Sequence, residues 1–130
     1  MRQETLDLIR EGVAAFNRRD VDGMLAPLRP DVQLEPLRAV LEGTVYEGHE
    51  GLRQWLEDMA EDWEDFAVQL DDLSAVGGDH VLVEARVHAR GRASGVVMDA
   101  GGAWLCDVRE GKVSRVRFYT DREAALAAIS

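Results

Sequence analysis

The chain is poor in cysteine and in long apolar runs, and both shortages narrow the class of protein. A single cysteine, Cys106, excludes an intrachain disulfide framework and favours a reducing compartment. No apolar stretch approaches the roughly 20 residues that a membrane-spanning helix needs. Residues 1–4 are polar and already helical in pattern, so we expect no signal peptide. We therefore expect a cytoplasmic protein.

Basic side chains are also scarce. The 130 residues include 25 acidic and 15 basic ones, for a formal net charge of −10. Nucleic acid and anionic membranes would repel such a chain, so we expect neither as a partner. The excess lies in residues 1–72, which hold 18 acidic and 7 basic residues. Eight of these acids fall between 57 and 72, where we expect a solvated surface, with a docking site for a cationic partner as the alternative.

Metal-binding side chains are too few and too scattered to form a site. The histidines, His49, His80 and His88, show no ligand spacing, and no second pair of Cys or His completes a zinc site. We expect structural roles for His49 and His88, an exposed side chain at His80, an inert buried thiol at Cys106, and neither a metal nor a cofactor. The Gly-rich residues 91–95 have no strand-to-helix context, so they predict a turn and not a phosphate site.

The apolar residues that are present predict helices and strands in one α+β domain over residues 1–130. Helical spacing predicts a helix over residues 4–18, a short one after the N-cap Asp20, and one over residues 49–63. Pro27 predicts a kink or an early end of the second helix. Alternation predicts strands at 32–36, 66–76, 80–90, 96–108 and 112–119, with a brief one at 44–47 inside a loop.

Residues 104–130 form the clearest segment: a strand, a tight turn, a strand and a capped helix. Thr120 and Glu123 have the spacing of a capping box, in which each side chain satisfies a backbone N–H of the first turn. Gly101 and Gly102 predict a bulge or a sharp bend in the strand that leads into this segment. The order of elements predicts a strongly bent antiparallel sheet.

Strand alternation divides the sheet into an apolar and a charged face. Burying Glu84, Arg86 and Arg117 in a dry core would cost too much free energy, so the apolar face must meet the helices. The outer face then carries a cross-strand charge ladder at a polar dimer interface. We expect this dimer face to contain Glu84, Arg86, His88, Arg115 and Arg117.

The apolar face and the helices predict a concave apolar pocket. Three tryptophans around one concavity are suited to stacking on a flat apolar ligand, with plain core packing as the alternative. The expected ligand pocket consists of Phe16, Met24, Trp55, Met59, Trp63, Val83, Val87, Trp104, Cys106 and Phe118.

Three segments, in this order and spacing, resemble the SnoaL-like branch of the nuclear transport factor 2-like superfamily. They are AFNRRDVDGM at 15–24, YEGHEGL at 46–52, and residues 104–130. The resemblance implies a cone-shaped roll of a strongly bent mixed or antiparallel sheet, wrapped on three N-terminal helices, with a short C-terminal helix. It also implies a homodimer joined through the outer sheet face, and a pocket that opens at the wide end of the cone.

This chain lacks the catalytic residues of the best-known enzymes of this superfamily. Ketosteroid isomerase uses an aspartate base with a tyrosine and a protonated aspartate as donors, and the matching positions hold Pro36, Gly12 and Trp104. Limonene epoxide hydrolase keeps an acid on its last strand, where this chain has Phe118. No residue matches the acidic group of the polyketide cyclases. The resemblance therefore implies the fold without one of these reactions.

Three functional hypotheses remain open. The first is a homodimer whose pocket binds a small, largely apolar molecule. The second is an isomerase, cyclase or hydratase acting on an enolisable carbonyl compound. It needs a carboxylate from Glu35, Asp99 or Asp121 in the pocket, with Tyr46 as a hydrogen-bond donor. The third is a non-catalytic structural or regulatory dimer whose cone is filled.

Overall fold

The computed structural model describes residues 3–36, 43 and 45–129. Its elements follow the order of helices and strands expected from the sequence. They are α1 (Gln3–Asn17), α2 (Val21–Leu25), β1 (Leu28–Glu35), β2 (Tyr46–Glu47), α4 (Gly48–Asp62), β3 (Trp63–Val76), β4 (His80–Gly91), β5 (Val97–Arg109), β6 (Lys112–Tyr119) and α5 (Arg122–Ala127).

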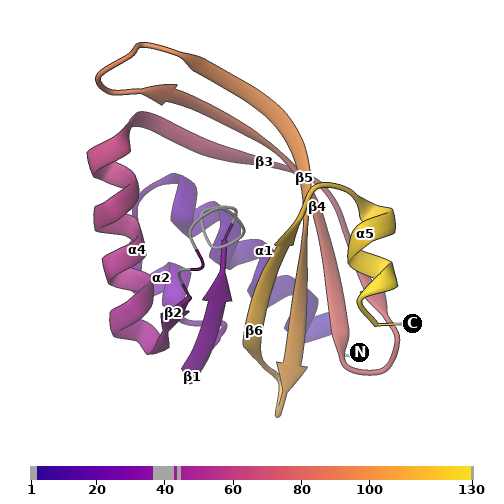
Figure 1. Cartoon of the computed structure of the whole chain (residues 1–130). Helices are drawn as coiled ribbons and strands as arrows, with labels where there is room; N and C mark the ends of the chain where they lie inside the picture. The colour runs from indigo at the N-terminus through magenta and orange to yellow at the C-terminus, as the bar shows by residue number, and fades with distance from the viewer. Residues whose placement is uncertain (1–2, 37–42, 44, 130) are drawn as a thin grey trace.

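The strands form one six-stranded sheet in the order β2-β1-β6-β5-β4-β3. β1 runs parallel to β6, and every other neighbouring pair is antiparallel, so the sheet is mixed. Figure 1 shows the long strands β3, β4 and β5 bending so that the sheet curls around α1, α2 and α4. The predicted α+β class and the cone-shaped roll are confirmed.

The bend in β5 does not come from a bulge at Gly101 and Gly102. The β4–β5 ladder runs from His80↔Asp107 to Arg90↔Val97 without a register shift, so that part of the prediction is wrong. Gly102 instead makes room: a Cβ there would lie 2.6 Å from Cε1 of Phe118. The register shifts lie elsewhere, at Leu28–Gln33 in β1, at Trp63–Asp65 and Leu70–Asp72 in β3, and at Asp107–Val108 in β5.

Some element ends match the sequence-based expectation and others differ from it. The N-cap at Asp20 is confirmed, because its side chain accepts a hydrogen bond from the Gly23 backbone N–H at 3.1 Å. α2 ends at Leu25, so the early end before Pro27 is also confirmed. Trp63 has extended backbone and begins β3 rather than ending α4. The brief strand predicted at 44–47 begins at Tyr46, and residue 44 lies outside the described residues.

The C-terminal helix is capped one residue later than predicted. The Asp121 carboxylate accepts a hydrogen bond from the Ala124 backbone N–H at 2.8 Å, which makes Asp121 the N-cap of α5. The capping box of Thr120 and Glu123 is therefore wrong. Asp ranks above Thr as an N-cap, and the neighbouring Asp takes the position.

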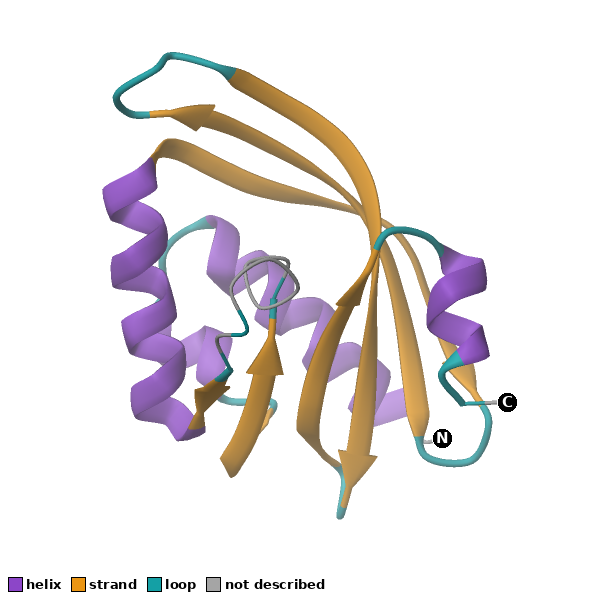
Figure 2. Cartoon of the chain, viewed as in Figure 1, coloured by secondary structure: helices purple, strands orange, loops and turns teal. Residues whose placement is uncertain are grey.

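The core occupies the concave side of the sheet. The sequence predicts that the apolar face of the sheet meets the helices, and the apolar residues of β4 on this face are all buried: Val81, Val83, Ala85, Val87 and Ala89. A second, smaller core lies on the outer face, where α5 covers Leu82 and Ala103 with Ala125. Figure 2 shows α5 on the opposite side of the sheet from α4. Part of the outer face is therefore closed by this chain's own helix.

Candidate functional site

An apolar cavity of about 180 Å³, here called the inner cavity, lies between α1, α4 and the concave face of the sheet. α1 approaches Pro27, the residue before β1, closely because residue 12 is glycine: a Cβ there would lie 2.9 Å from Cγ of Pro27. Six of the predicted pocket residues line the cavity: Phe16, Met24, Trp55, Val83, Trp104 and Cys106. Sequence reasoning missed other lining residues, among them Ile9, Leu34, Leu52, Phe66, Val68 and Val116.

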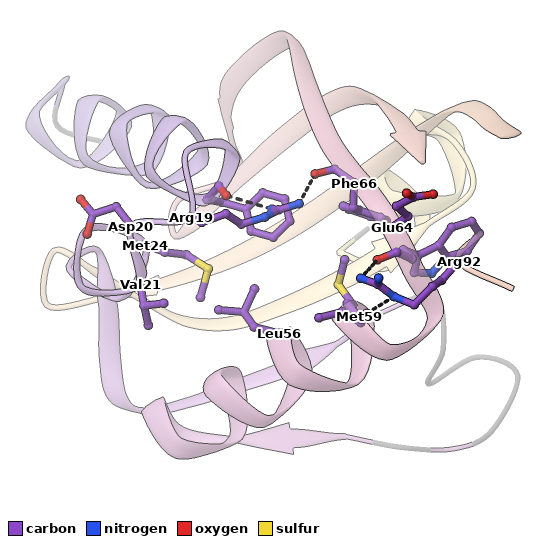
Figure 3. Close-up of a pocket in the computed structure, with 12 residues that line it drawn as sticks. Arg19, Asp20, Val21, Met24, Leu56, Met59, Glu64, Phe66 and Arg92 are labelled. Carbon is purple, nitrogen blue, oxygen red and sulfur yellow. Dashed lines mark hydrogen bonds between the residues drawn. The ribbon is translucent and has the colours of Figure 1, made fainter. Parts of the chain in front are cut away.

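A second pocket of about 200 Å³, here called the outer pocket, lies where α1, α2, α4 and β3 meet (Figure 3). The predicted residues Met59 and Trp63 line it rather than the inner cavity. Phe16, Met24 and Phe66 line both spaces and separate them. The single concavity expected from the sequence is therefore divided in two.

Aromatic packing accounts for this division. The Phe16 ring stacks on Trp55 with 5.7 Å between centroids and meets the edge of Phe66 at 5.8 Å. Offset and edge-to-face contacts of this kind stabilise a ring position beyond the burial of its area. Trp55 and Trp104 line the inner cavity and Trp63 the outer pocket, so the three tryptophans do not surround one space.

Two predicted pocket residues line neither space. Val87 is buried at 7% exposure farther along β4. The Phe118 ring packs edge-on against Trp104, with 5.1 Å between the centroids, above Gly102. Phe118 therefore supports the wall of the inner cavity from behind Trp104.

The inner cavity offers one ionisable group among the described residues, the Cys106 thiol. Burial raises the pKa of this thiol to about 12, and the negative charge of Asp107 adds to the effect. Cys106 is consequently protonated at neutral pH, and a protonated thiol is a poor nucleophile. The described lining supplies dispersion and aromatic contacts and no group that exchanges protons near pH 7.

The two candidate acids on strands lie on the outer face, away from both spaces. Glu35 accepts a hydrogen bond from Nε of Arg115 at 2.6 Å. Asp99 lies 3.1 Å from Arg86 and 3.5 Å from His88. Their positions follow from strand alternation, which gives each acid an arginine neighbour on the polar side.

The other two catalytic candidates also have structural partners. Asp121 caps α5. The Tyr46 side chain is buried, and its hydroxyl donates to Oδ2 of Asp58 on α4 at 2.7 Å. Neither residue lines the inner cavity or the outer pocket. In the described part of the chain, the set of acids and donor that the enzyme hypothesis requires does not meet at a pocket.

The predicted dimer face is a ladder of ion pairs. Arg117 lies 3.2 Å from Asp107, and Glu84 lies 3.2 Å from Arg122 of α5. With the pair of Arg115 and Glu35 and the contacts of Arg86 and His88 to Asp99, all five predicted residues have a partner within the chain. Arg86 and His88 remain half-exposed, at 48% and 47% of their side-chain area.

The histidines have partners that fit structural roles. Nε2 of His49 lies 3.1 Å from the Leu28 carbonyl oxygen, which ties the start of α4 to β1. His80 lies 3.4 Å from Asp107. Over residues 3–36, 43 and 45–129, no three His, Cys, Asp or Glu side chains gather in a way that would hold a metal ion. Within the same residues, no helix has the length and apolarity to cross a bilayer.

Sequence reasoning missed two arginines, Arg19 and Arg92, which line the outer pocket. The guanidinium of Arg19 lies over the Phe16 ring at 5.1 Å from its centroid, and that of Arg92 donates to the Ala60 carbonyl at 3.0 Å. One signal for Arg19 exists: it follows the end of α1, where a left-handed residue is common. Nothing in the local pattern marks Arg92.

A curled mixed sheet that encloses helices and an apolar cavity defines the class of nuclear transport factor 2-like folds. Within this class, the chain belongs to the SnoaL-like domain family, whose model matches residues 9–116. No curated protein matches the sequence of this chain.

Solved structures agree in fold at low sequence identity. A nuclear transport factor 2-like protein of unknown function from Burkholderia pseudomallei is 19% identical with a TM-score of 0.81, over 99% of both chains. TerC, co-crystallised with polyporic acid, is 22% identical with a TM-score of 0.80, over 98% of both chains. A provisionally assigned polyketide cyclase from Xanthomonas campestris is 26% identical with a TM-score of 0.73, over 99% of this chain and 98% of its own.

Proposed function

We propose that the protein binds a small, neutral, largely apolar molecule in the inner cavity. The observation that carries this proposal is a space of about 180 Å³ whose described lining is apolar apart from one protonated thiol. A protein cavity of about 150 Å³ lined by Leu, Ile and Phe stays dry and binds benzene. The inner cavity therefore matches the size of a single-ring compound.

The lining also indicates the chemical class of the ligand. Trp55 and Trp104 provide aromatic surfaces for offset or edge-on contact with a ring. A charged ligand would lose its hydration without gaining a partner among the described lining residues, at a cost of several kcal/mol. Neutral aromatic or aliphatic rings are favoured over ions. The lack of a described acid at this cavity is the reason to propose binding rather than proton transfer.

Thermal unfolding with neutral one-ring compounds such as toluene and indole tests this function. Bound ligand should raise the melting temperature with concentration, because a ligand present at about 100 times its Kd stabilises the folded state by about 2.7 kcal/mol. Val83→Phe, which places a ring in the cavity, should abolish the rise. Val97→Phe adds the same ring at a position that is 67% exposed and should keep it. A series in which no compound raises the melting temperature, or in which Val83→Phe responds like Val97→Phe, contradicts the proposal.

The protein's assembly and location belong to the same proposal. Two copies associate through the outer sheet face, where Arg86, His88 and Asp99 are half-exposed and α5 leaves the face open. The free thiol of Cys106 supports a reducing cytoplasmic location.

A further inference from the structure

The outer pocket carries positive charge that the inner cavity lacks. Arg19, just after α1, and Arg92, just after β4, both line it. Met24, Leu56 and Met59 supply an apolar surface across from Arg19 (Figure 3). A space with an apolar floor and cationic walls suits a ligand that has an apolar body and a negative group.

Both guanidinium groups are held in place by backbone carbonyl groups. Arg19 donates from Nη1 to the Phe16 oxygen at 3.1 Å and from Nη2 to the Phe66 oxygen. Arg92 donates from Nε to the Ala60 oxygen at 3.0 Å and from Nη2 to the Trp63 oxygen at 3.4 Å. A guanidinium has five N–H donors, so these contacts fix each group and leave donors for a ligand.

Neither arginine pairs with a carboxylate of the described chain, although the protein is strongly acidic. Other arginines do: Arg86, Arg115 and Arg117 each lie within 3.2 Å of an acid. The positive charge at the outer pocket is therefore not neutralised by a direct contact among residues 3–36, 43 and 45–129.

The two acids that line the outer pocket do not fill it with negative charge. The Asp20 carboxylate accepts from the Gly23 backbone N–H and lies 3.4 Å from Arg18. Figure 3 shows the Glu64 carboxylate pointing away from Leu56 and Met59. Glu64 lies within the register shift of β3 between Trp63 and Asp65. Such a bulge re-aims side chains, here at the edge of the pocket.

The backbone at Arg19 adds an independent observation. Its φ is 61°, in the left-handed region that favours glycine or asparagine. The Asp20 N–H bonds to the Ala15 oxygen at 2.9 Å and the Arg19 N–H to the Phe16 oxygen at 3.1 Å, the two bonds of a Schellman helix end. Glycine would meet this backbone requirement with less strain, so the presence of arginine points to a use for its side chain.

We propose that the outer pocket is a second binding site, for a small organic carboxylate with an apolar body. The body rests on Met24, Leu56 and Met59, and the carboxylate accepts N–H groups of Arg19, while Arg92 adds attraction through its charge. The volume of about 200 Å³ accommodates a one-ring acid such as benzoate. This site goes beyond the neutral ligand proposed for the inner cavity.

Benzoate and its neutral counterpart benzyl alcohol separate charge recognition from apolar packing. Calorimetric titration of the full chain at pH 7 and low salt should give a Kd on the order of 1 mM for benzoate. In Val83→Phe, whose inner cavity is filled, benzyl alcohol should bind at least about tenfold more weakly than benzoate, because it lacks the charge-assisted hydrogen bonds. The same titration in high salt should weaken benzoate binding and leave the alcohol unchanged.

Three variants locate the site. Arg19→Asn keeps a residue that tolerates the left-handed backbone, and it should weaken benzoate binding about tenfold or more. Arg92→Gln should weaken it less. Arg10→Asn, at an exposed arginine of α1 that lines neither space, should leave it unchanged. Circular dichroism confirms that each variant is folded.

The outcomes also separate this site from the inner cavity. Val83→Phe should abolish toluene binding and leave benzoate binding intact. The proposal is overturned if benzoate does not bind, if benzyl alcohol binds Val83→Phe as well as benzoate does, or if folded Arg19→Asn binds benzoate like the unmodified chain. Loss of benzoate binding in Val83→Phe overturns it too, since the acid would then occupy the inner cavity.

Discussion

At the scale of single residues, a missing side chain shapes the wall of the inner cavity. Phe118 occupies the space beside Gly102 and supports Trp104 with 5.1 Å between their rings. A Cβ on Gly102 would meet two atoms of the Phe118 ring, at 2.6 and 3.1 Å. The neighbouring Gly101 faces open space, since a Cβ at that position would have no described atom within 4 Å.

These two glycines give a matched stability test. Gly102→Ala should lower the free energy of unfolding by about 1–3 kcal/mol, because the new methyl forces the Phe118 ring to move in a packed wall. Gly101→Ala should leave it unchanged or raise it slightly, since alanine restricts the unfolded chain without a clash. Urea unfolding measures both. Equal effects of the two substitutions would show that contact with Phe118 does not constrain position 102.

Single residues also show where sequence reasoning succeeds and where it stops. Val83, Trp104 and Cys106 are predictable as cavity residues, because alternation and the cost of burying charge fix the faces of β4 and β5. The division of the pocket is not predictable in this way. It depends on where α1 crosses the sheet and on the ring position of Phe16, which contacts from α4 and β3 determine.

The same distinction holds for charged residues. Alternation correctly separates Glu84 and Arg86 from the core. It says nothing of Arg19 and Arg92, whose partners are backbone carbonyl groups at element ends. Hydrogen bonds of that kind depend on the tertiary arrangement and leave no periodic signal in the sequence.

At the scale of elements, the start of α5 shows how one residue can displace its neighbour as the helix N-cap. Thr120 and Glu123 have the right spacing for a capping box, yet the helix begins after Asp121. α5 then lies over Leu82 and Ala103 on the outer face. The position of the cap therefore determines which part of that face is covered.

Substitutions at Thr120 and Asp121 test which of the two residues is the N-cap of α5. Asp121→Ala should cost about 1 kcal/mol of stability, because the Ala124 N–H loses its acceptor. Thr120→Ala should cost little, since the structure gives its hydroxyl no capping bond. Urea unfolding and amide exchange of residues 122–127 report the difference. A larger loss of stability in Thr120→Ala than in Asp121→Ala would contradict this start of α5 and support the capping box instead.

At the scale of the whole molecule, the curvature of the sheet creates a concave side that can enclose a ligand. The concave side holds the inner cavity, and the convex side is divided between α5 and an open region with half-exposed charges. The element order and the resemblance to the SnoaL-like branch were enough to predict this shape. The number of spaces inside it required the side-chain positions.

We expect two copies of the chain to associate through the open region of the convex side. Multi-angle light scattering should give twice the mass of the chain. Arg86→Glu should weaken the dimer about tenfold or more, because it places an acid beside Asp99 and removes the arginine that pairs with it. Arg10→Glu on α1 makes the same charge change away from the sheet and should keep the dimer. A monomeric mass for the unmodified chain, or equal behaviour of the two variants, contradicts association through this face.

Crystals soaked with iodobenzene show directly whether the inner cavity holds a neutral ring. Iodine scatters anomalously, so one map locates the ligand without interpretation of weak density. We expect an iodine peak between Val83, Trp104 and Trp55 in the unmodified chain, and none there in Val83→Phe. An inner cavity without iodine, or a peak that persists in Val83→Phe, would contradict the proposed binding.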